Sequence, residues 1–218
     1  MNKAKRVVNY YVLIAKLKEV IRKGWKNACV SKERLESVAD HVYSTENLAI
    51  AMYYVYKPDI DLKKVIMMLA VHEIEEIIIG DIAVSDPEYK HAKDNAHNIV
   101  ESVLETLGEA EEVKDLIFEF DEKATKEAKF AFLCDKLDCD IQAKLYSEQC
   151  GFDKEELKNK NNFFTSHVVN GNETLSDIWL PWDEHIYQDD EDFKSVFDYV
   201  FNNEILSFRS EFENDIKD

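Results

Sequence analysis

A cluster of ionisable residues interrupts an apolar stretch near the middle of the chain. Residues 69–83 read LAVHEIEEIIIGDIA, so His72, Glu73 and Glu76 stand among leucine, valine and isoleucine side chains. A buried carboxylate is costly unless it is paired, hydrogen-bonded or bound to a metal ion. The stretch is therefore either a surface helix with a crowded polar face or part of a site that holds an occupant. Glu75, which has no inward partner in this pattern, is expected to be an ordinary surface charge.

Two more residues of the same chemical kinds stand on faces that are expected to point inward. His41 follows ESVAD and shares one helical face with Val38 and Met52. Taken alone, it is most simply a core histidine hydrogen-bonded to a carbonyl group. Asp135 follows the apolar run FAFLC at the flank of an apolar stripe. Taken alone, it is equally well an aspartate that caps a helix or forms a salt bridge.

Together these residues supply two imidazole and two carboxylate groups from three separate segments. The four candidate ligands are His41, His72, Glu73 and Asp135. Such donors suit a divalent ion such as Mn, Fe, Co, Mg or Zn, with positions left for water and substrate. The ion would lower the pKa of a bound water and provide hydroxide near neutral pH. Glu76, on the same helix face as His72, and Asp81 would then transfer protons or orient the ligands.

The elements that position these residues are predicted to be helices, in an all-α fold of about six to eight helices. Only 5 Gly and 3 Pro in 218 residues leave few turn signals. Apolar periodicity predicts helices at 4–23, 36–56, 61–79, 88–107, 109–121, 125–149 and 189–212. Residues 158–188 are rich in Asn, Thr and aromatic residues, which predicts a long loop or lid. The length is that of a single domain over residues 1–218.

Two tryptophans of the predicted loop have two interpretations. Trp179 and Trp182 could close over a nucleobase by stacking, because an aromatic platform suits any base. The simpler interpretation is that they anchor the loop to the core.

The charge balance and the cysteines limit the partners and the compartment. A total of 27 Lys and Arg against 45 Asp and Glu gives a net charge of −18, a field that repels nucleic acid and anionic membranes at long range. No run approaches the apolar length that a membrane span needs. The four cysteines show no metal-type or paired spacing, which predicts reduced thiols in a cytoplasmic protein. The basic N-terminal segment has apolar residues at helical spacing, which predicts an amphipathic helix rather than a secretion signal.

Four short motifs of this sequence, in this order, resemble the HD-domain metal-dependent phosphohydrolases, in particular the 5′-deoxynucleotidase branch of the YfbR type. The motifs are GW at 24–25, ESVADH at 36–41, HE followed by E and GDIA within 72–83, and EAKF leading to an aspartate within 127–135. The resemblance spans roughly residues 10–150. It implies an all-α fold, a commonly dimeric assembly, and removal of the 5′-phosphate from deoxynucleoside monophosphates by a metal-held water.

The resemblance also implies roles for individual residues. It places the metal ligands at His41, His72, Glu73 and Asp135. It places two functional carboxylates at Glu76 and Asp81, without deciding which one handles a proton and which one contacts the sugar. It implies that Trp25 and Lys26 line the substrate site.

Two positions depart from the family pattern. The second residue of the family's His-Asp pair is Glu73 here, and the extra methylene moves its carboxylate by on the order of 1.5 Å, a shift to which catalytic geometry is sensitive. The phosphate-binding arginine that follows Gly-Trp in the family is absent, so Lys26 or Arg34 would substitute for it. These departures motivate an alternative, a non-catalytic HD-like protein that binds a nucleotide or a regulatory partner.

Overall fold

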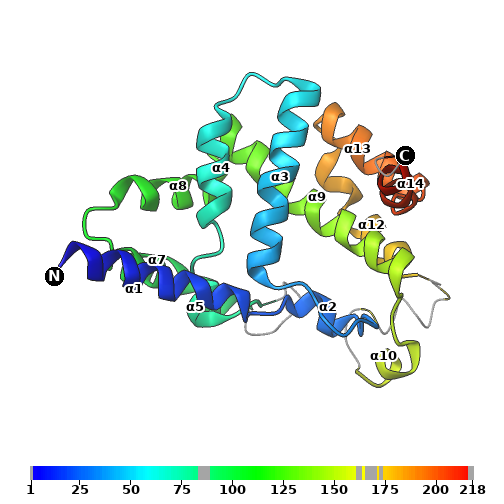
Figure 1. The fold of residues 1–218 in the computed structure, drawn as a ribbon, viewed down its shortest axis with the longest axis horizontal. Helices are drawn as coiled ribbons and strands as arrows, with labels where there is room; N and C mark the ends of the chain where they lie inside the picture. Colours follow the sequence, from blue (N-terminus) through cyan, green and yellow to red (C-terminus); the bar gives the residue numbers. More distant parts are fainter. Residues whose placement is uncertain (1, 83–88, 161–163, 165–170, 172–173, 216–218) are drawn as a thin grey trace. The chain divides into compact units, whose positions relative to one another are not determined.

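The computed structural model describes residues 2–82, 89–160, 164, 171 and 174–215, and this part of the chain is all-α (Figure 1). Its β-type pairings are two isolated bridges, Ile21 with Ser37 and Val30 with Phe152. The predicted fold class is confirmed. The chain divides into two compact units, Met1–Gly24 with Leu35–Asp135 and Trp25–Arg34 with Lys136–Asp218.

The first unit contains all four candidate ligands. Its helices are α1 (Lys3–Ala15), η1 (Lys16–Lys18), α3 (Val38–Tyr56), α4 (Leu62–Val71), α5 (Glu76–Ile79), α6 (Tyr89–Asp94), α7 (Ala96–Leu104), α8 (Glu111–Glu122) and the first part of α9 (Lys126–Gln149). α3 packs against α4 and η1, α4 packs against α8, and α7 packs against α1 and α8. One cluster of buried side chains in its core consists of Leu17, Val38, Val71, Ile74, Ile77, Ile99, Val100, Val103, Leu104 and Ile117.

Polar caps fix where the helices next to the candidate ligands begin. At the start of α3, the Ser37 hydroxyl accepts a hydrogen bond from the Asp40 backbone N–H, and the Asp40 carboxylate accepts one from the Ser37 backbone N–H. This reciprocal capping box satisfies donors that a helix start leaves unpaired. At the start of α4, the Asp61 carboxylate caps the helix through the backbone N–H of Lys63. The cap of α3 determines that His41 falls at the end of the first helical turn.

The second unit takes the C-terminal part of α9. Its other helices are α10 (Lys154–Lys160), α12 (Leu175–Asp183), η2 (Glu184–Tyr187), α13 (Glu191–Asn202) and α14 (Ser207–Asp215), and the short α2 (Lys23–Asn27) ends in it. η2 packs against α12 and α13. Trp179 on α12 packs against the buried ring of Trp25, which is the behaviour of an anchor, whereas Trp182 is exposed.

Four predicted helices are divided or shortened, so the described part of the chain has more helices than six to eight. The helix predicted at 61–79 is broken by a turn at residues 72–75. The helix predicted at 4–23 gives way to η1 after Ala15, and the one at 88–107 is divided into α6 and α7. The helix predicted at 189–212 is divided into α13 and α14, because Asn203 adopts extended backbone geometry.

The prediction of a long loop at 158–188 is wrong for the residues of this segment that form helices in the structure. Leu175–Asp183 form α12 and Glu184–Tyr187 form η2. The helix begins with a capping box between Thr174 and Asp177, a local start signal that outweighs the irregular composition around it. Residues 161–163, 165–170 and 172–173 of the predicted loop lie outside the described residues. None of the described helices combines the length and the apolar character that a membrane crossing requires.

Candidate metal centre

His41 on α3 is a completely buried residue that meets a carboxylate. Its side chain is 0% exposed, and its Nε2 lies 3.0 Å from Oδ1 of Asp135 on α9. An imidazole nitrogen at this distance either donates a proton to the carboxylate or shares a cation with it. His41 is therefore a core histidine by burial, but one ring nitrogen is directed at a charged group.

His72 and Glu73 occupy the turn between α4 and α5. His72 is the C-cap of α4, so the prediction that His72 and Glu76 share one continuous helix face is wrong. The His72 ring is fixed to α4, because its Nδ1 lies 2.7 Å from the carbonyl oxygen of Leu69. The turn brings Oε1 of Glu73 to 3.6 Å from Nε2 of His72. The break in the helix thus directs two consecutive residues at one point.

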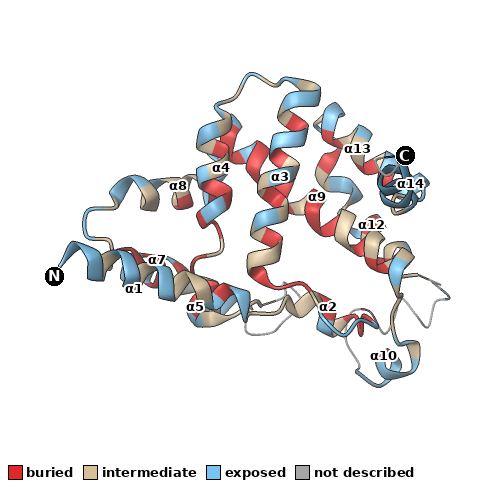
Figure 2. Ribbon diagram, in the orientation of Figure 1, coloured by how far each residue is buried: buried red, intermediate tan, exposed pale blue. Residues whose placement is uncertain are grey.

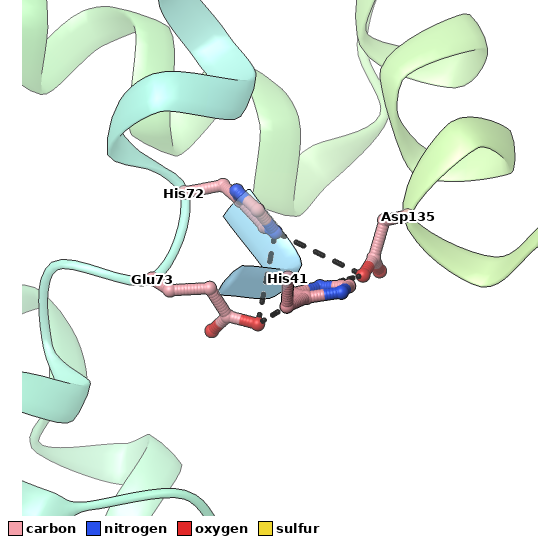
Figure 3. A group of neighbouring side chains, drawn as sticks. All are labelled: His41, His72, Glu73 and Asp135. Atoms are coloured by element: carbon pink, nitrogen blue, oxygen red, sulfur yellow. Dashed lines mark hydrogen bonds and ion pairs between the residues drawn. The ribbon is translucent and has the colours of Figure 1, made fainter. Parts of the chain in front are cut away.

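The four candidate ligands meet in the first unit (Figure 3). One donor atom from each of His41, His72, Glu73 and Asp135 lies within 4.8 Å of the others. Nε2 of His41 lies 3.9 Å from Oε1 of Glu73, and Nε2 of His72 lies 3.8 Å from Oδ1 of Asp135. Donors held about 2.1 Å from one ion stand about 3 Å apart at a right angle and about 4 Å apart when opposed. The observed separations fall in this range, so the residues fit a divalent ion.

One buried nitrogen of this group has no hydrogen-bond partner. His72 Nε2 is shielded from solvent and makes no hydrogen bond, whereas Nδ1 is bonded to the carbonyl of Leu69. A carbonyl oxygen only accepts, so in the neutral ring Nδ1 carries the proton and Nε2 presents a lone pair. Proteins orient metal-ligating histidines by this kind of bond from the other ring nitrogen. The unpartnered lone pair independently favours an ion between the four residues.

Arg22 is a cation beside the cluster that was not predicted from the sequence. Its Nη1 lies 3.3 Å from Oε1 of Glu73 and 3.9 Å from Oδ1 of Asp81, and its side chain is mostly buried. Burial by itself raises the pKa of Glu73, but His72 and Arg22 outweigh burial and hold that pKa below its ordinary value. The signal for Arg22 was its place just before Gly24-Trp25, whereas the family pattern directs attention to the residues after this pair.

Glu76 and Asp81 lie near the cluster in contrasting environments. Glu76 is buried with Oε2 unpartnered, and burial, reinforced by the carboxylates of Glu73 and Asp81, raises its pKa to about 11. Asp81 follows Gly80, which ends α5 at a φ of 70°, a left-handed value that glycine adopts without strain. The Asp81 carboxylate accepts a hydrogen bond from the Lys23 backbone N–H. Glu76 thus favours its protonated form, while Asp81 is held by a backbone donor and faces a cation.

The prediction that Glu75 is a surface charge is wrong, because the residue is buried. In a continuous helix Glu75, three residues after His72, would lie on the same side of the helix as His72. Glu75 lies at the end of the turn at residues 72–75, and its side chain is buried with those of His72 and Glu76.

The two predicted substrate residues, Trp25 and Lys26, belong to the second unit. Trp25 is 1% exposed, with ring centroids 5.3 Å from Tyr146 and 4.6 Å from Trp179. The Lys26 side chain is exposed, and its carbonyl oxygen accepts a hydrogen bond from Lys160 Nζ at 2.7 Å. Their part in substrate binding stays a prediction.

Comparison with known proteins finds matches over most of the chain. The HD domain family matches residues 14–179. A Xenopus laevis protein named 5′-deoxynucleotidase HDDC2 is 33% identical over 149 residues, which cover 66% of this chain and 71% of that protein. A Dictyostelium discoideum protein of the same name is 31% identical over 170 residues, which cover 73% of this chain and 86% of that protein.

Solved structures resemble the fold. The PH0347 protein from Pyrococcus horikoshii superposes with a TM-score of 0.66 at 23% identity, covering 89% of this chain and 98% of that one. A predicted metal-dependent phosphohydrolase from Magnetospirillum magnetotacticum superposes with a TM-score of 0.60 at 20% identity, covering 91% of this chain and 90% of that one.

Proposed function

The chain belongs to the HD domain family, and on this premise we propose that it is a metal-dependent phosphohydrolase that releases the 5′-phosphate of (deoxy)nucleoside monophosphates. The activity named for the Xenopus laevis and Dictyostelium discoideum relatives supports this substrate class. The observation that carries the proposal is the buried group of two imidazoles and two carboxylates, with the lone pair of His72 Nε2 directed at the carboxylates.

In this proposal the four clustered residues hold one divalent ion. They are His41, His72, Glu73 and Asp135. When bound, the ion supplies Lewis-acid stabilisation of a phosphate oxygen and a hydroxide nucleophile near neutral pH. The chain orients the ligands through the Leu69 carbonyl at His72 and through Arg22 at Glu73. Because Glu73 lies in a turn, its longer side chain does not require α4 to shift.

Arg22 is the proposed substitute for the arginine that is absent after Gly24-Trp25. Its guanidinium already lies among the carboxylates of the candidate site, 3.3 Å from Glu73 and 3.9 Å from Asp81. Guanidinium is a planar donor that pairs with two phosphate oxygens at once, which lysine does not do. A local cation is also needed because the chain as a whole carries a net charge of −18 and repels a phosphate.

Glu76 is the proposed proton donor to the leaving 5′-oxygen of the nucleoside. Its carboxyl is buried beside the carboxylates of Glu73 and Asp81, and these surroundings raise its pKa and favour the protonated form that a general acid needs. Asp81 is instead the proposed holder of Arg22 and of the chain at Lys23, through the contacts that its carboxylate makes there. In this proposal Glu76, and not Asp81, handles the proton, a choice that the sequence left open.

The test is a phosphate-release assay on purified protein with a panel of nucleoside 5′-monophosphates and added Mn or Co. The wild-type chain is expected to turn over, and His72→Ala is expected to lose both bound metal and activity while keeping its helical circular-dichroism signal. Unchanged phosphate release by His72→Ala overturns the proposal. Bound metal without turnover across the panel favours the alternative, a non-catalytic nucleotide-binding protein. The reason to consider this alternative is that Glu73 stands where the family pattern has aspartate.

We also propose a cytoplasmic homodimer with one domain over residues 1–218 and no nucleic-acid partner. All four cysteines are free thiols, as suits a reducing compartment. The net charge of −18 opposes binding to a polyanion. Sedimentation analysis and a nucleic-acid binding assay test the assembly and the partner.

A further inference from the structure

The C-terminal helix α14 has no buried residue along its length (Figure 2). Phe208 and Phe212 lie one turn apart with ring centroids 5.9 Å apart, and both are exposed. The base of the helix is held, because Glu148 accepts hydrogen bonds from the backbone N–H groups of Ile205 and Leu206. A helix of 9 residues is only marginally stable in water unless its apolar face is covered. α14 therefore has an apolar face that needs a cover.

The N-terminal helix α1 has apolar side chains on two faces. The side chains that pack against the core of the first unit are Tyr10, Leu13 and Ile14. The exposed apolar side chains are Val7, Val8, Tyr11 and Val12. At 100° per residue these four occupy one continuous face. A helix that is apolar on both sides is expected to be covered on both sides, so α1 also presents a face that needs a cover.

The two faces have opposite charges at their edges. Residues 1–18 contain Lys3, Lys5, Arg6, Lys16 and Lys18 and no acidic residue. α14 contains Glu211, Glu213 and Asp215 against Arg209. Lys5 and Lys16 flank the exposed face of α1 beside Val12, and Glu211 and Asp215 flank Phe208 on α14. Within the described part of the chain, none of these four flanking residues has an ion-pair partner.

We propose that α14 of one copy packs its Phe208 and Phe212 face onto the exposed face of α1 in a second copy, and that the second copy does the same in return. The inference rests on the proposed homodimer and names its interface. A second copy is the occupant because it supplies both a basic apolar face and an acidic aromatic one. Two reciprocal contacts related by a two-fold axis close the assembly at a dimer.

Self-association of so acidic a chain needs such an arrangement. Two copies, each with a net charge of −18, repel unless they meet where basic residues oppose acidic ones. Residues 1–18 provide the longest stretch at either end that is free of acid. α14 lies beyond residues 14–179, which the HD domain family matches, so this interface would be a feature of this chain rather than of the family.

The test is a charge swap on the full-length chain, read by sedimentation or light scattering over a concentration series at low salt. The double variants Lys5→Glu with Lys16→Glu and Glu211→Lys with Asp215→Lys are each expected to raise the dimer dissociation constant about tenfold, because attractive edges become repulsive at both contacts. The quadruple variant, which has the wild-type net charge, is expected to restore the wild-type constant. The control Lys63→Glu with Lys129→Glu makes the same charge change at exposed sites on α4 and α9 and is expected to leave it unchanged.

The outcomes separate the interface from the assembly. A dimer that neither charge-reversed pair weakens overturns the α1 and α14 interface and leaves the homodimer standing. A wild-type chain that is monomeric throughout the series overturns both. Phe208→Ser with Phe212→Ser is a second variant that removes the apolar contact without changing charge, and an unchanged dissociation constant for it also overturns the interface. None of these measurements depends on phosphatase activity.

Discussion

Two buried carboxyl groups on α9, Asp135 and Asp140, lie in opposite surroundings. In the first unit, Oδ1 of Asp135 lies 3.0 Å from Nε2 of His41 and 3.8 Å from Nε2 of His72. In the second unit, Oδ2 of Asp140 accepts the Tyr187 hydroxyl at 2.5 Å, while its Oδ1 has no hydrogen-bond partner. Burial, followed by the nearby carboxylate of Asp183, raises the pKa of Asp140 to about 8.

The difference teaches that burial alone does not identify a functional acid. Both residues are almost fully buried, and each directly follows a buried cysteine of α9. Asp135 converges with another carboxylate and two imidazoles, which is an arrangement for sharing a cation. Asp140 faces a hydroxyl and another acid, which favours a neutral carboxyl that serves as a hydrogen-bond partner. The neighbours therefore decide the role.

The largest expected effect comes from making the same substitution at both sites. Asp135→Asn should lower kcat/KM for phosphate release by about 10³-fold or more and should remove bound metal, because a proposed ligand of the ion is lost. Asp140→Asn should leave kcat/KM and metal content near the wild-type level. The measurements are steady-state kinetics with Mn or Co and elemental analysis of the purified proteins. An equal loss of activity in the two variants would contradict the claim that Asp135 and Asp140 have different roles.

Glu76→Gln is expected to lower kcat by about 10²-fold while leaving metal content unchanged. The amide keeps the shape of the side chain, but its N–H protons are too weakly acidic to be transferred to a leaving oxygen. The same kinetic assay and metal analysis check this. Loss of metal together with activity would instead mean that Glu76, like Asp135, is needed for metal binding.

Arg22→Lys is expected to raise KM about tenfold, because a point charge replaces a planar two-pronged donor at the proposed phosphate site. Arg34→Lys, the matched substitution at the exposed arginine considered from the sequence, should leave KM unchanged. A rise in KM for Arg34→Lys alone would assign phosphate binding to Arg34 and would falsify its assignment to Arg22.

Asp140 is expected to make the stability of the chain depend on pH. The folded state holds its proton up to about pH 8, whereas the unfolded state releases it near the ordinary aspartate pKa of 3.8. The stabilisation is therefore complete below about pH 4, and it declines as the pH rises from about 4 to 8 by at most about 1.4 kcal/mol per unit.

The measurement is urea unfolding of the wild type and Asp140→Asn at a series of pH values. The free energy of unfolding of Asp140→Asn minus that of the wild type should increase from pH 5 to pH 8. A constant difference would mean that Asp140 titrates at an ordinary pKa, and its contrast with Asp135 would then be one of position only.

Much of the site could be predicted from the sequence, because its residues carry their own signals. His41 and Asp135 stand beside apolar stripes, so their helix faces indicate that they point inward. His72 and Glu73 interrupt an apolar run where an exposed position is not expected. The structure places these four donors together, as predicted. The loop prediction is wrong over Leu175–Tyr187, which are helical, although Thr174 and Asp177 have the pattern of a helix start.

Arg22 and Glu75 could not be placed by such reasoning. Arg22 is directed at Glu73 and Asp81, which are far from it in the chain, and no local period encodes that approach. Glu75 is buried, and α4 stops at Val71 although residues 72–75 have nothing that forbids a helix. The bond between the His72 ring and the Leu69 carbonyl accompanies the turn, and it too is visible only in the folded chain.

By itself, the sequence determined the helical class and the chemical identity of the four donors, because periodicity and residue type are local properties of the chain. The tertiary structure alone decided how LAVHEIEEIIIGDIA is divided: a turn at residues 72–75 and a cation, Arg22, beside Glu73. It also decided that Asp135 faces imidazoles while Asp140 faces a hydroxyl. Separations of a few ångströms between distant segments depend on how whole helices pack, which no local pattern specifies.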